Sequence, residues 1–239
     1  MANGRAGDLA NATPGGRAVR IRIHLPVRAD ERAQLAIGHL PTRAQLHIRC
    51  RPNKMNTVPD EPDMRRSGPI PSCYWLVDDV LLAGEYPSAD EYQDARDKLA
   101  KFLDAGIRTF IDLTEVGEGP PKYDNLLRAM AAERGIEVRH VRHAIRDLGV
   151  PREREHMTRI LSAIREEIAG GRPVYVHCWG GIGRTGTVVG CWLAEEGIAG
   201  PAAIEQIAEL RAGSPGCRTP SPETEEQRRY VCEWLQDEG

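Results

Sequence analysis

The chain has 239 residues, of which 41% are hydrophobic and 28% charged, and its formal net charge is −3 at pH 7. This length and composition are typical of one soluble domain with some additional sequence. No run of about 18 apolar residues occurs, which argues against a membrane span. The first residues also lack the apolar stretch of a secretory signal. We therefore expect a cytoplasmic protein that does not associate with membranes.

The cysteines follow no pattern that indicates a disulfide framework or a zinc site. There are six of them, without any Cys-x-x-Cys pair, namely Cys50, Cys73, Cys178, Cys191, Cys217 and Cys232. Scattered cysteines of this kind are typical of reduced thiols in a cytosolic protein. We expect no bound metal ion.

Charge and aromatic residues are unevenly distributed along the chain. Residues 1–70 contain 12 Lys and Arg against 6 Asp and Glu, whereas the remainder contains 20 against 29. The first aromatic residue is Tyr74. A basic segment without aromatic residues is poorly equipped to form a core. We therefore predict a basic, largely irregular extension over residues 1–70 and one folded domain over residues 71–239.

The extension has one sign of order, because apolar residues from Val19 to Leu25 alternate with basic ones at strand period. Three interpretations stay open: a mostly disordered basic arm, an arm that binds a partner or nucleic acid, and a natural start at Met55 or Met64. Basic composition alone supports only non-specific attraction. We do not predict specific binding to nucleic acid.

From residue 71 onward, helical and strand periods alternate. Ser88 and Glu91 have the spacing of a capping box, which predicts a helix that ends at Gly106. The further predicted elements are a strand at 107–113, a helix at 123–134, a strand at 136–141, a helix from 151 to 169, a strand at 173–178, and helices from about 184, at 201–212 and at 223–236. The helix from residue 151 carries one apolar stripe, formed by Met157, Ile160, Leu161, Ile164 and Ile168. This alternation predicts an α/β fold with a central, mainly parallel sheet flanked by helices.

The sequence VHCWGGIGRTG, residues 176–186, joins the last predicted strand to the following helix. Glycines allow unusual dihedral angles, so successive backbone N–H groups can point inward and bind an anion next to the helix N-terminus. The planar guanidinium of Arg184 can hold two oxygens of one phosphate group. A Walker A loop is excluded, because its GxxxxGK[ST] pattern is absent. The loop therefore predicts a binding site for a tetrahedral dianion.

Cys178 lies at the floor of this predicted loop. The loop amides, the helix N-terminus and Arg184 all favour the thiolate over the thiol, and a thiolate that faces a bound phosphorus is a nucleophile. We expect the ring of His177 to fix the loop, and we expect Thr185 to donate a hydrogen bond to the sulfur.

The segment His177–Gly186 resembles the HCxxGxxRTG signature of the protein tyrosine and dual-specificity phosphatases. The resemblance extends from about residue 71 to the end of the chain and includes none of the first 70 residues. It implies a phosphocysteine intermediate and a reaction without metal or cofactor. It also implies that the phosphate is held by Trp179, Gly180, Gly181, Ile182, Gly183 and Arg184.

Such a reaction requires an acid that protonates the leaving oxygen. Asp147 lies in the predicted loop between a strand and a helix, 31 residues before Cys178. The phosphatases that this segment resembles have an aspartate about thirty residues before the cysteine. We therefore predict that Asp147 is the acid. The alternative acids are Asp112, Glu115 and Asp124.

Hydrolysis of a phosphocysteine also requires a positioned water. Residues 221–231 resemble the phosphatase segment that carries two glutamines, of which the second matches Gln227. The first is replaced by Glu223, which leaves the water-positioning residue open between Gln227, Glu223 and Asp147 acting as a base.

The substrate is best predicted as a phosphoprotein, with phosphotyrosine favoured and phosphoserine or phosphothreonine open. The loop contains no lysine, which disfavours phosphoinositides, and Tyr123 is expected in the core of a helix. The alternatives are a non-catalytic phosphate-binding module, a phosphatase for a small molecule or an RNA 5′ phosphate, and a rhodanese-like sulfur transferase. We expect a monomer.

Overall fold

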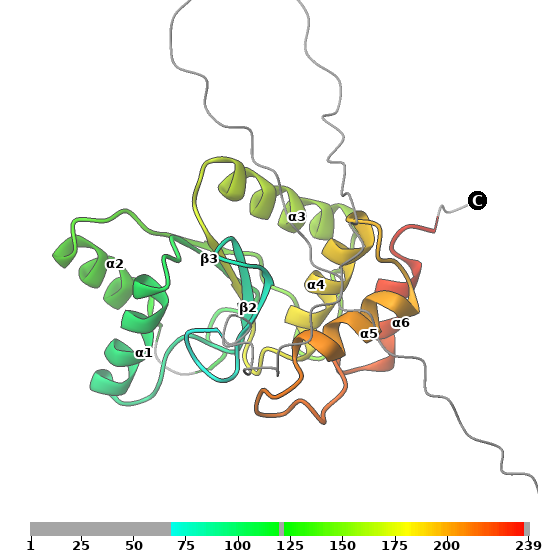
Figure 1. Ribbon diagram of the computed structural model, residues 1–239, viewed down its shortest axis with the longest axis horizontal. Coiled ribbons are helices and arrows are strands. Elements are labelled where there is room, and N and C mark those ends of the chain that lie inside the picture. The colour runs from blue at the N-terminus through cyan, green and yellow to red at the C-terminus, as the bar shows by residue number, and fades with distance from the viewer. Residues whose placement is uncertain (1–67, 120–121, 237–239) are drawn as a thin grey trace, which may run out of the picture.

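The computed structural model describes residues 68–119 and 122–236 (Figure 1). The predictions for residues 1–67, including the strand period near Val19 and the alternative starts, lie outside the described residues. Residues 68–70, which the sequence assigned to the extension, pack on the domain: Ile70 is buried in a core cluster, and the Gly68 N–H donates to the Cys73 carbonyl at 3.4 Å.

The described residues form five strands and six helices. In chain order these are β1 (Tyr74–Val77), β2 (Leu81–Gly84), α1 (Tyr92–Asp104), β3 (Thr109–Asp112), α2 (Asp124–Glu133), β4 (Arg139–Arg142), α3 (Arg154–Ala169), β5 (Val174–His177), α4 (Gly183–Glu195), α5 (Pro201–Leu210) and α6 (Glu225–Glu233). None of the helices in this part of the chain is long and apolar enough to cross a membrane.

The strands form one sheet in the order β1-β2-β5-β3-β4. All neighbours are parallel except β1 and β2, which pair antiparallel. The predicted α/β fold with a mainly parallel sheet is therefore confirmed. The β1–β2 hairpin was not predicted; its turn contains Asp79 at a φ of 59°, a conformation that Asp tolerates better than most residues.

Helices cover both faces of the sheet. Successive side chains of β5 point to opposite faces, so they belong to two separate apolar cores. Val174 and Val176 pack with residues of α3, α4, α5 and α6, whereas Tyr175 packs with residues of α1 and α2. Figure 1 shows these two groups of helices on opposite sides of β2 and β3. The predicted apolar stripe of α3 is buried along its whole length.

The predicted start of the first helix is wrong. Helix α1 begins at Tyr92, and Ser88 forms no cap. The ammonium group of Lys98 instead binds the carbonyl oxygens of Tyr86 at 2.8 Å and Ser88 at 3.3 Å. These bonds hold residues 86–88 in an irregular conformation before the helix.

The central strand β5 and the buried helix α4 position the predicted phosphate loop. His177 at the end of β5 pairs with Gly84 of β2 and with Asp112 of β3, so the three parallel strands end at one level. Loops that follow such strand ends are where open α/β sheets bind their ligands. The candidate site therefore lies at this edge of the sheet.

Candidate active site

The loop between β5 and α4 forms the predicted cradle with free backbone donors. No described residue accepts a hydrogen bond from the N–H groups of residues 179–183. Gly181 has a φ of +68°, and a Cβ at this position would lie 2.3 Å from the backbone carbon of Gly84. The loop thus packs tightly against the end of β2 and leaves five successive donors available for an anion.

Arg184, in the first turn of α4, is 2% exposed and has several partners around the cradle. Its Nη1 donates to the carbonyl oxygen of Ile145 at 3.2 Å and to Glu118 Oε2 at 2.7 Å. Its Nη2 binds Glu118 Oε1 and lies 2.9 Å from Asp147 Oδ1. Burial would lower the pKa of Arg184, but Glu118 and a negative charge at Cys178 raise it above its ordinary value. Arg184 therefore stays charged.

Cys178 follows β5 directly and is 3% exposed. Cys178 precedes the loop and Arg184 lies in the first turn of α4 that follows it, so the thiol and the guanidinium come from the two ends of one short loop. The structure therefore brings the predicted nucleophile, the predicted phosphate ligand and Asp147 together. Their catalytic roles stay predictions.

Asp147 lies in the loop between β4 and α3, which we call the acid loop and define as residues 143–151. Its side chain is 63% exposed, and its one ion pair within the described residues is with Arg184. The next residue, Leu148, has a φ of 58°. The exposed carboxylate of Asp147 therefore lies at the entrance of the cradle, next to Arg184.

Asp112 is held in a network that excludes it as the acid. It is fully buried, and its carboxylate accepts hydrogen bonds from Thr114, His140 Nε2 at 3.0 Å and Arg142 Nη2 at 2.7 Å. Burial alone would raise the pKa of Asp112, but the hydrogen bonds from His140 and Thr114 hold it well below its ordinary value. Asp112 therefore remains ionised and cannot donate a proton near neutral pH.

The other two alternative acids do not contact Arg184. Glu115 is exposed and lines a separate cavity, described below. Asp124 is the first residue of α2, and its Oδ1 is buried without a partner among the described residues.

The ring of His177 contacts the backbone at the start of the loop. Its Nδ1 lies 3.1 Å from the Cys178 carbonyl oxygen, and its Nε2 lies 2.7 Å from the hydroxyl of Tyr123. Burial lowers the pKa of His177 to about 4, so the ring is neutral near pH 7. A neutral ring has one N–H, which it can give to the carbonyl while Tyr123 donates to the other nitrogen.

The hydrogen bond predicted from Thr185 to the sulfur is not present. The Thr185 hydroxyl instead donates to the Gly84 carbonyl oxygen at 3.4 Å. The first turn of α4 packs against the end of β2, and this carbonyl is the acceptor that the buried hydroxyl meets there.

Gln227 and Glu223 both lie beside the cradle, but Gln227 is engaged. Its Oε1 accepts from the N–H groups of Glu223 and Thr224, each at 3.1 Å, and its Nε2 donates to the Gly149 carbonyl at 2.9 Å. Gln227 therefore caps α6 and anchors the acid loop. The carboxylate of Glu223 forms no hydrogen bond with described residues, and its Oε2 would lie 3.2 Å from a Cβ at Gly183.

Aromatic side chains form one wall of the site. The rings of Tyr86 and Trp179 have centroids 5.6 Å apart, and the N–H of Tyr86 donates to the Trp179 carbonyl at 2.8 Å. Tyr86 also contacts Tyr123, which lies in the core as predicted, with a centroid distance of 5.3 Å. Trp179 remains exposed at the entrance.

Sequence reasoning missed Glu118 and Tyr86. Each follows a parallel strand that ends at the candidate site: Tyr86 comes two residues after β2, and Glu118 six residues after β3. The rule that the carboxyl ends of parallel strands form the site would have pointed to both loops, had β2 been predicted.

Comparisons with known proteins find phosphatases among the matches. Residues 87–198 match a family model described as "Polymorphic toxin system, DSP-PTPase phosphatase". The putative tyrosine phosphatase 067L of Invertebrate iridescent virus 3 is 30% identical over 123 residues, which are 50% of this chain and 45% of the viral protein. The uncharacterized protein MJECL20 of Methanocaldococcus jannaschii is 40% identical over 91 residues, 38% of this chain and 56% of that protein. The chain thus spans about half the length of the curated relatives it matches.

Solved structures show the same fold. Tk-PTP in its active form is 27% identical, with a TM-score of 0.50 over 71% of this chain and 99% of that chain. P. aeruginosa TpbA in complex with pTyr has a TM-score of 0.51 over 71% of this chain and 90% of that chain, and at 14% identity it shows the fold alone. Residues 87–198 therefore match the DSP-PTPase phosphatase family, and the domain has the fold of the protein tyrosine and dual-specificity phosphatases.

Proposed function

We propose that this protein is a cysteine-dependent, metal-independent phosphatase that hydrolyses phosphotyrosine in protein substrates. The observation that carries the proposal is that Cys178, Arg184 and Asp147 lie at one loop whose five successive N–H groups donate to no described residue. The proposal includes that the enzyme is a cytoplasmic monomer. The five cysteines of the described residues are all free thiols.

In the first step, the loop N–H groups and Arg184 bind the oxygens of the phosphate dianion. The Cys178 thiolate attacks phosphorus, so a P–S bond forms while the bond to the leaving oxygen breaks. Asp147 gives its proton to that oxygen, and tyrosine leaves as a neutral phenol. The transition state spreads charge over three equatorial oxygens, which face donors that need no reorganisation.

In the second step, water attacks the phosphocysteine. The Asp147 carboxylate, which has just lost its proton, takes one from this water, the P–S bond breaks, and inorganic phosphate and the thiolate are released. Gln227 acts indirectly in this scheme, because its amide is engaged with α6 and the acid loop. Its part is to hold the loop that carries Asp147.

The depth and rim of the site support a phosphotyrosine substrate. Cys178 and Arg184 are 3% and 2% exposed, so a phosphate must extend into a recess to reach them. Exposed Trp179, Val116 and Leu148 come from the three loops that carry Cys178, Glu118 and Asp147. A phenyl ring spans such a recess and contacts apolar side chains, whereas the short side chain of phosphoserine does neither.

The test is hydrolysis of matched substrates by the wild type and by Cys178→Ser. The substrates are one peptide carrying phosphotyrosine, the same peptide carrying phosphoserine, a phosphoinositide in mixed micelles, and an RNA with a 5′ phosphate, all with EDTA present. The proposal predicts a kcat/KM for phosphotyrosine at least about 100-fold above the others and no turnover by the variant. A higher kcat/KM for any other substrate would reject the proposed substrate class, and turnover by Cys178→Ser would reject the mechanism.

A further inference from the structure

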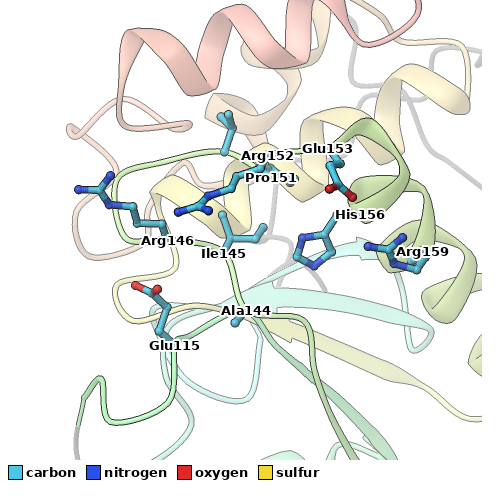
Figure 2. A pocket seen from close by; sticks show the side chains of 10 residues that line it. Glu115, Ala144, Ile145, Arg146, Pro151, Arg152, Glu153, His156 and Arg159 are labelled. Carbon is cyan, nitrogen blue, oxygen red and sulfur yellow. The ribbon is translucent and has the colours of Figure 1, made fainter.

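A cavity of about 300 Å³ lies beside the candidate active site, between the acid loop and the start of α3. Three arginines line it: Arg146 from the acid loop, Arg152 just after it, and Arg159 from α3 (Figure 2). The mechanism proposed above uses none of them.

These three arginines gather around one cavity without partners of their own among the described residues. Within the described ranges, Arg146, Arg152 and Arg159 form neither a salt bridge nor a side-chain hydrogen bond. Half of the other described arginines form a salt bridge, as in Arg96–Glu133, Arg134–Asp104, Arg139–Glu167, Arg142–Asp112 and Arg165–Glu195, whereas Arg128, Arg218 and Arg229 also have no side-chain partner there. An acidic domain with ample carboxylates thus leaves three guanidinium groups unpaired around one cavity.

The remaining groups do not cancel this positive charge. Two carboxylates, Glu115 and Glu153, line the cavity, against three guanidinium groups. His156 adds no charge near pH 7, because burial and then the charge of Arg159 lower its pKa. The N-terminus of the 16-residue helix α3 adds a partial positive charge at the same place. The cavity therefore suits an anionic group with more than one oxygen.

The cavity is joined to the phosphate cradle by two short connections. Ile145 lines the cavity, and its carbonyl oxygen accepts the 3.2 Å hydrogen bond from Arg184. Glu115 lines the cavity, and its backbone N–H donates to Glu118 Oε2 at 3.0 Å, the carboxylate that binds Arg184. An anion in the cavity thus lies beside the residues that hold Arg184, and one substrate molecule can reach both places.

We propose that this cavity is a second anion-binding subsite, which receives a carboxylate or phosphate group flanking the phosphotyrosine in the substrate peptide. The proposal rests on the function proposed above and adds a preference: substrates with acidic residues next to the phosphorylated tyrosine bind better.

The test compares two phosphotyrosyl peptides that differ only in flanking glutamates or glutamines. The wild type should hydrolyse the acidic peptide with a kcat/KM about tenfold higher, mainly through KM, because exposed charge pairs contribute modestly and are screened by salt. The double variant Arg152→Gln with Arg159→Gln should lose most of this preference and keep its rate on para-nitrophenyl phosphate. Arg128→Gln, which removes an exposed charge from α2 on the other face of the sheet, should keep the preference.

Several outcomes would overturn the subsite: no preference in the wild type, or a preference that the double variant retains. Stimulation of para-nitrophenyl phosphate hydrolysis by free sulfate in the wild type, but not in the double variant, would assign the cavity to a free anion instead. Measuring the binding of both peptides to Cys178→Ser tests the subsite without requiring turnover. A tenfold tighter Kd for the acidic peptide, lost when Arg152→Gln and Arg159→Gln are added, supports the subsite even if the wild type does not turn over.

Discussion

The carboxylate of Glu118 binds both terminal nitrogens of Arg184, with Oε2 2.7 Å from Nη1. Burial alone would raise the pKa of Glu118, but the hydrogen bond from Arg184 lowers it, so the pair is ionised. Among the described residues, Arg184 Nε has no partner. The Nε–H is therefore available for one phosphate oxygen while Glu118 fixes the plane of the guanidinium, and a second oxygen would take the place of Asp147 at Nη2.

Glu118→Gln should lower kcat/KM for para-nitrophenyl phosphate by about tenfold, because a bidentate, charge-assisted contact that orients Arg184 becomes a weaker one. Steady-state kinetics measure the change. Glu205→Gln, an exposed substitution on α5 with the same charge change, is the control and should have no effect. A higher kcat/KM for Glu118→Gln would contradict the orienting role and show that Glu118 competes with phosphate.

Asp147→Asn should lower kcat by about 100- to 10,000-fold for a phosphotyrosyl peptide, because the leaving phenolate then lacks its proton donor. The loss should be smaller for para-nitrophenyl phosphate, whose leaving group is stable as an anion. The melting temperature should change little, since Asp147 is exposed.

Asp112→Asn is the variant that compares Asp112 with Asp147 as the proton donor. Removing one charge from its buried network should cost about 3 to 5 kcal/mol of unfolding free energy, which denaturant titration measures. A stable Asp112→Asn protein with the leaving-group dependence expected of Asp147→Asn would show that the acid is assigned wrongly.

Gly181→Ala should inactivate the protein, because the new Cβ would lie 2.3 Å from the backbone of Gly84 and the φ of +68° is strained for alanine. Gly180→Ala is a matched control one residue away: its Cβ would meet only Ile182 Cδ1, at 4.0 Å. Phosphate binding by isothermal titration calorimetry and kcat/KM should both be lost at position 181 and kept at 180. Equal effects of the two changes would contradict the loop geometry.

The neutral ring of His177 predicts a pH dependence of stability. Burial lowers its pKa to about 4, from about 6.5 in the unfolded chain. Above pH 6.5 the ring of His177 is unprotonated in both the folded and the unfolded chain, so it does not lower the unfolding free energy. As the pH falls toward 4, only the unfolded state gains the proton, so up to about 3 kcal/mol of unfolding free energy is lost.

Urea titrations at pH 7 and pH 4.5 measure this loss in the wild type and in His177→Asn, which cannot titrate. The wild type should lose more stability than the variant between the two pH values. Equal losses would mean that the His177 ring is accessible to protons in the folded state.

The sequence predicted the sheet class, because apolar residues recur at strand spacing in β3 and β5. They also recur at helical spacing in the helices around these strands. It also predicted the loop from Cys178 to Arg184, since glycines at fixed spacing leave few other structures. The β1–β2 hairpin escaped, because Leu81 to Gly84 is a four-residue apolar run without alternation, buried on both faces. Short runs of this kind cannot be assigned from periodicity alone.

Side-chain partners were harder to predict than elements. The hydroxyl of Thr185 meets Gly84, and the amide of Gln227 meets Gly149, both far away in the sequence. Glu118 lies in a loop whose residues carry no periodic signal, and only the packing of three loops at one sheet edge brings it to Arg184. Such contacts depend on tertiary structure, which a local pattern does not encode.

The most direct test of the central claim is a search for the phosphocysteine. Rapid-quench mixing of wild-type protein with excess para-nitrophenyl phosphate in EDTA, followed by mass spectrometry of the acid-stopped protein, should show one phosphate on the peptide that contains Cys178. Cys178→Ser should show neither phosphorylated cysteine nor turnover. Steady turnover by the wild type with no phosphate on Cys178 at any quench time, or turnover that survives in Cys178→Ser, would contradict the account.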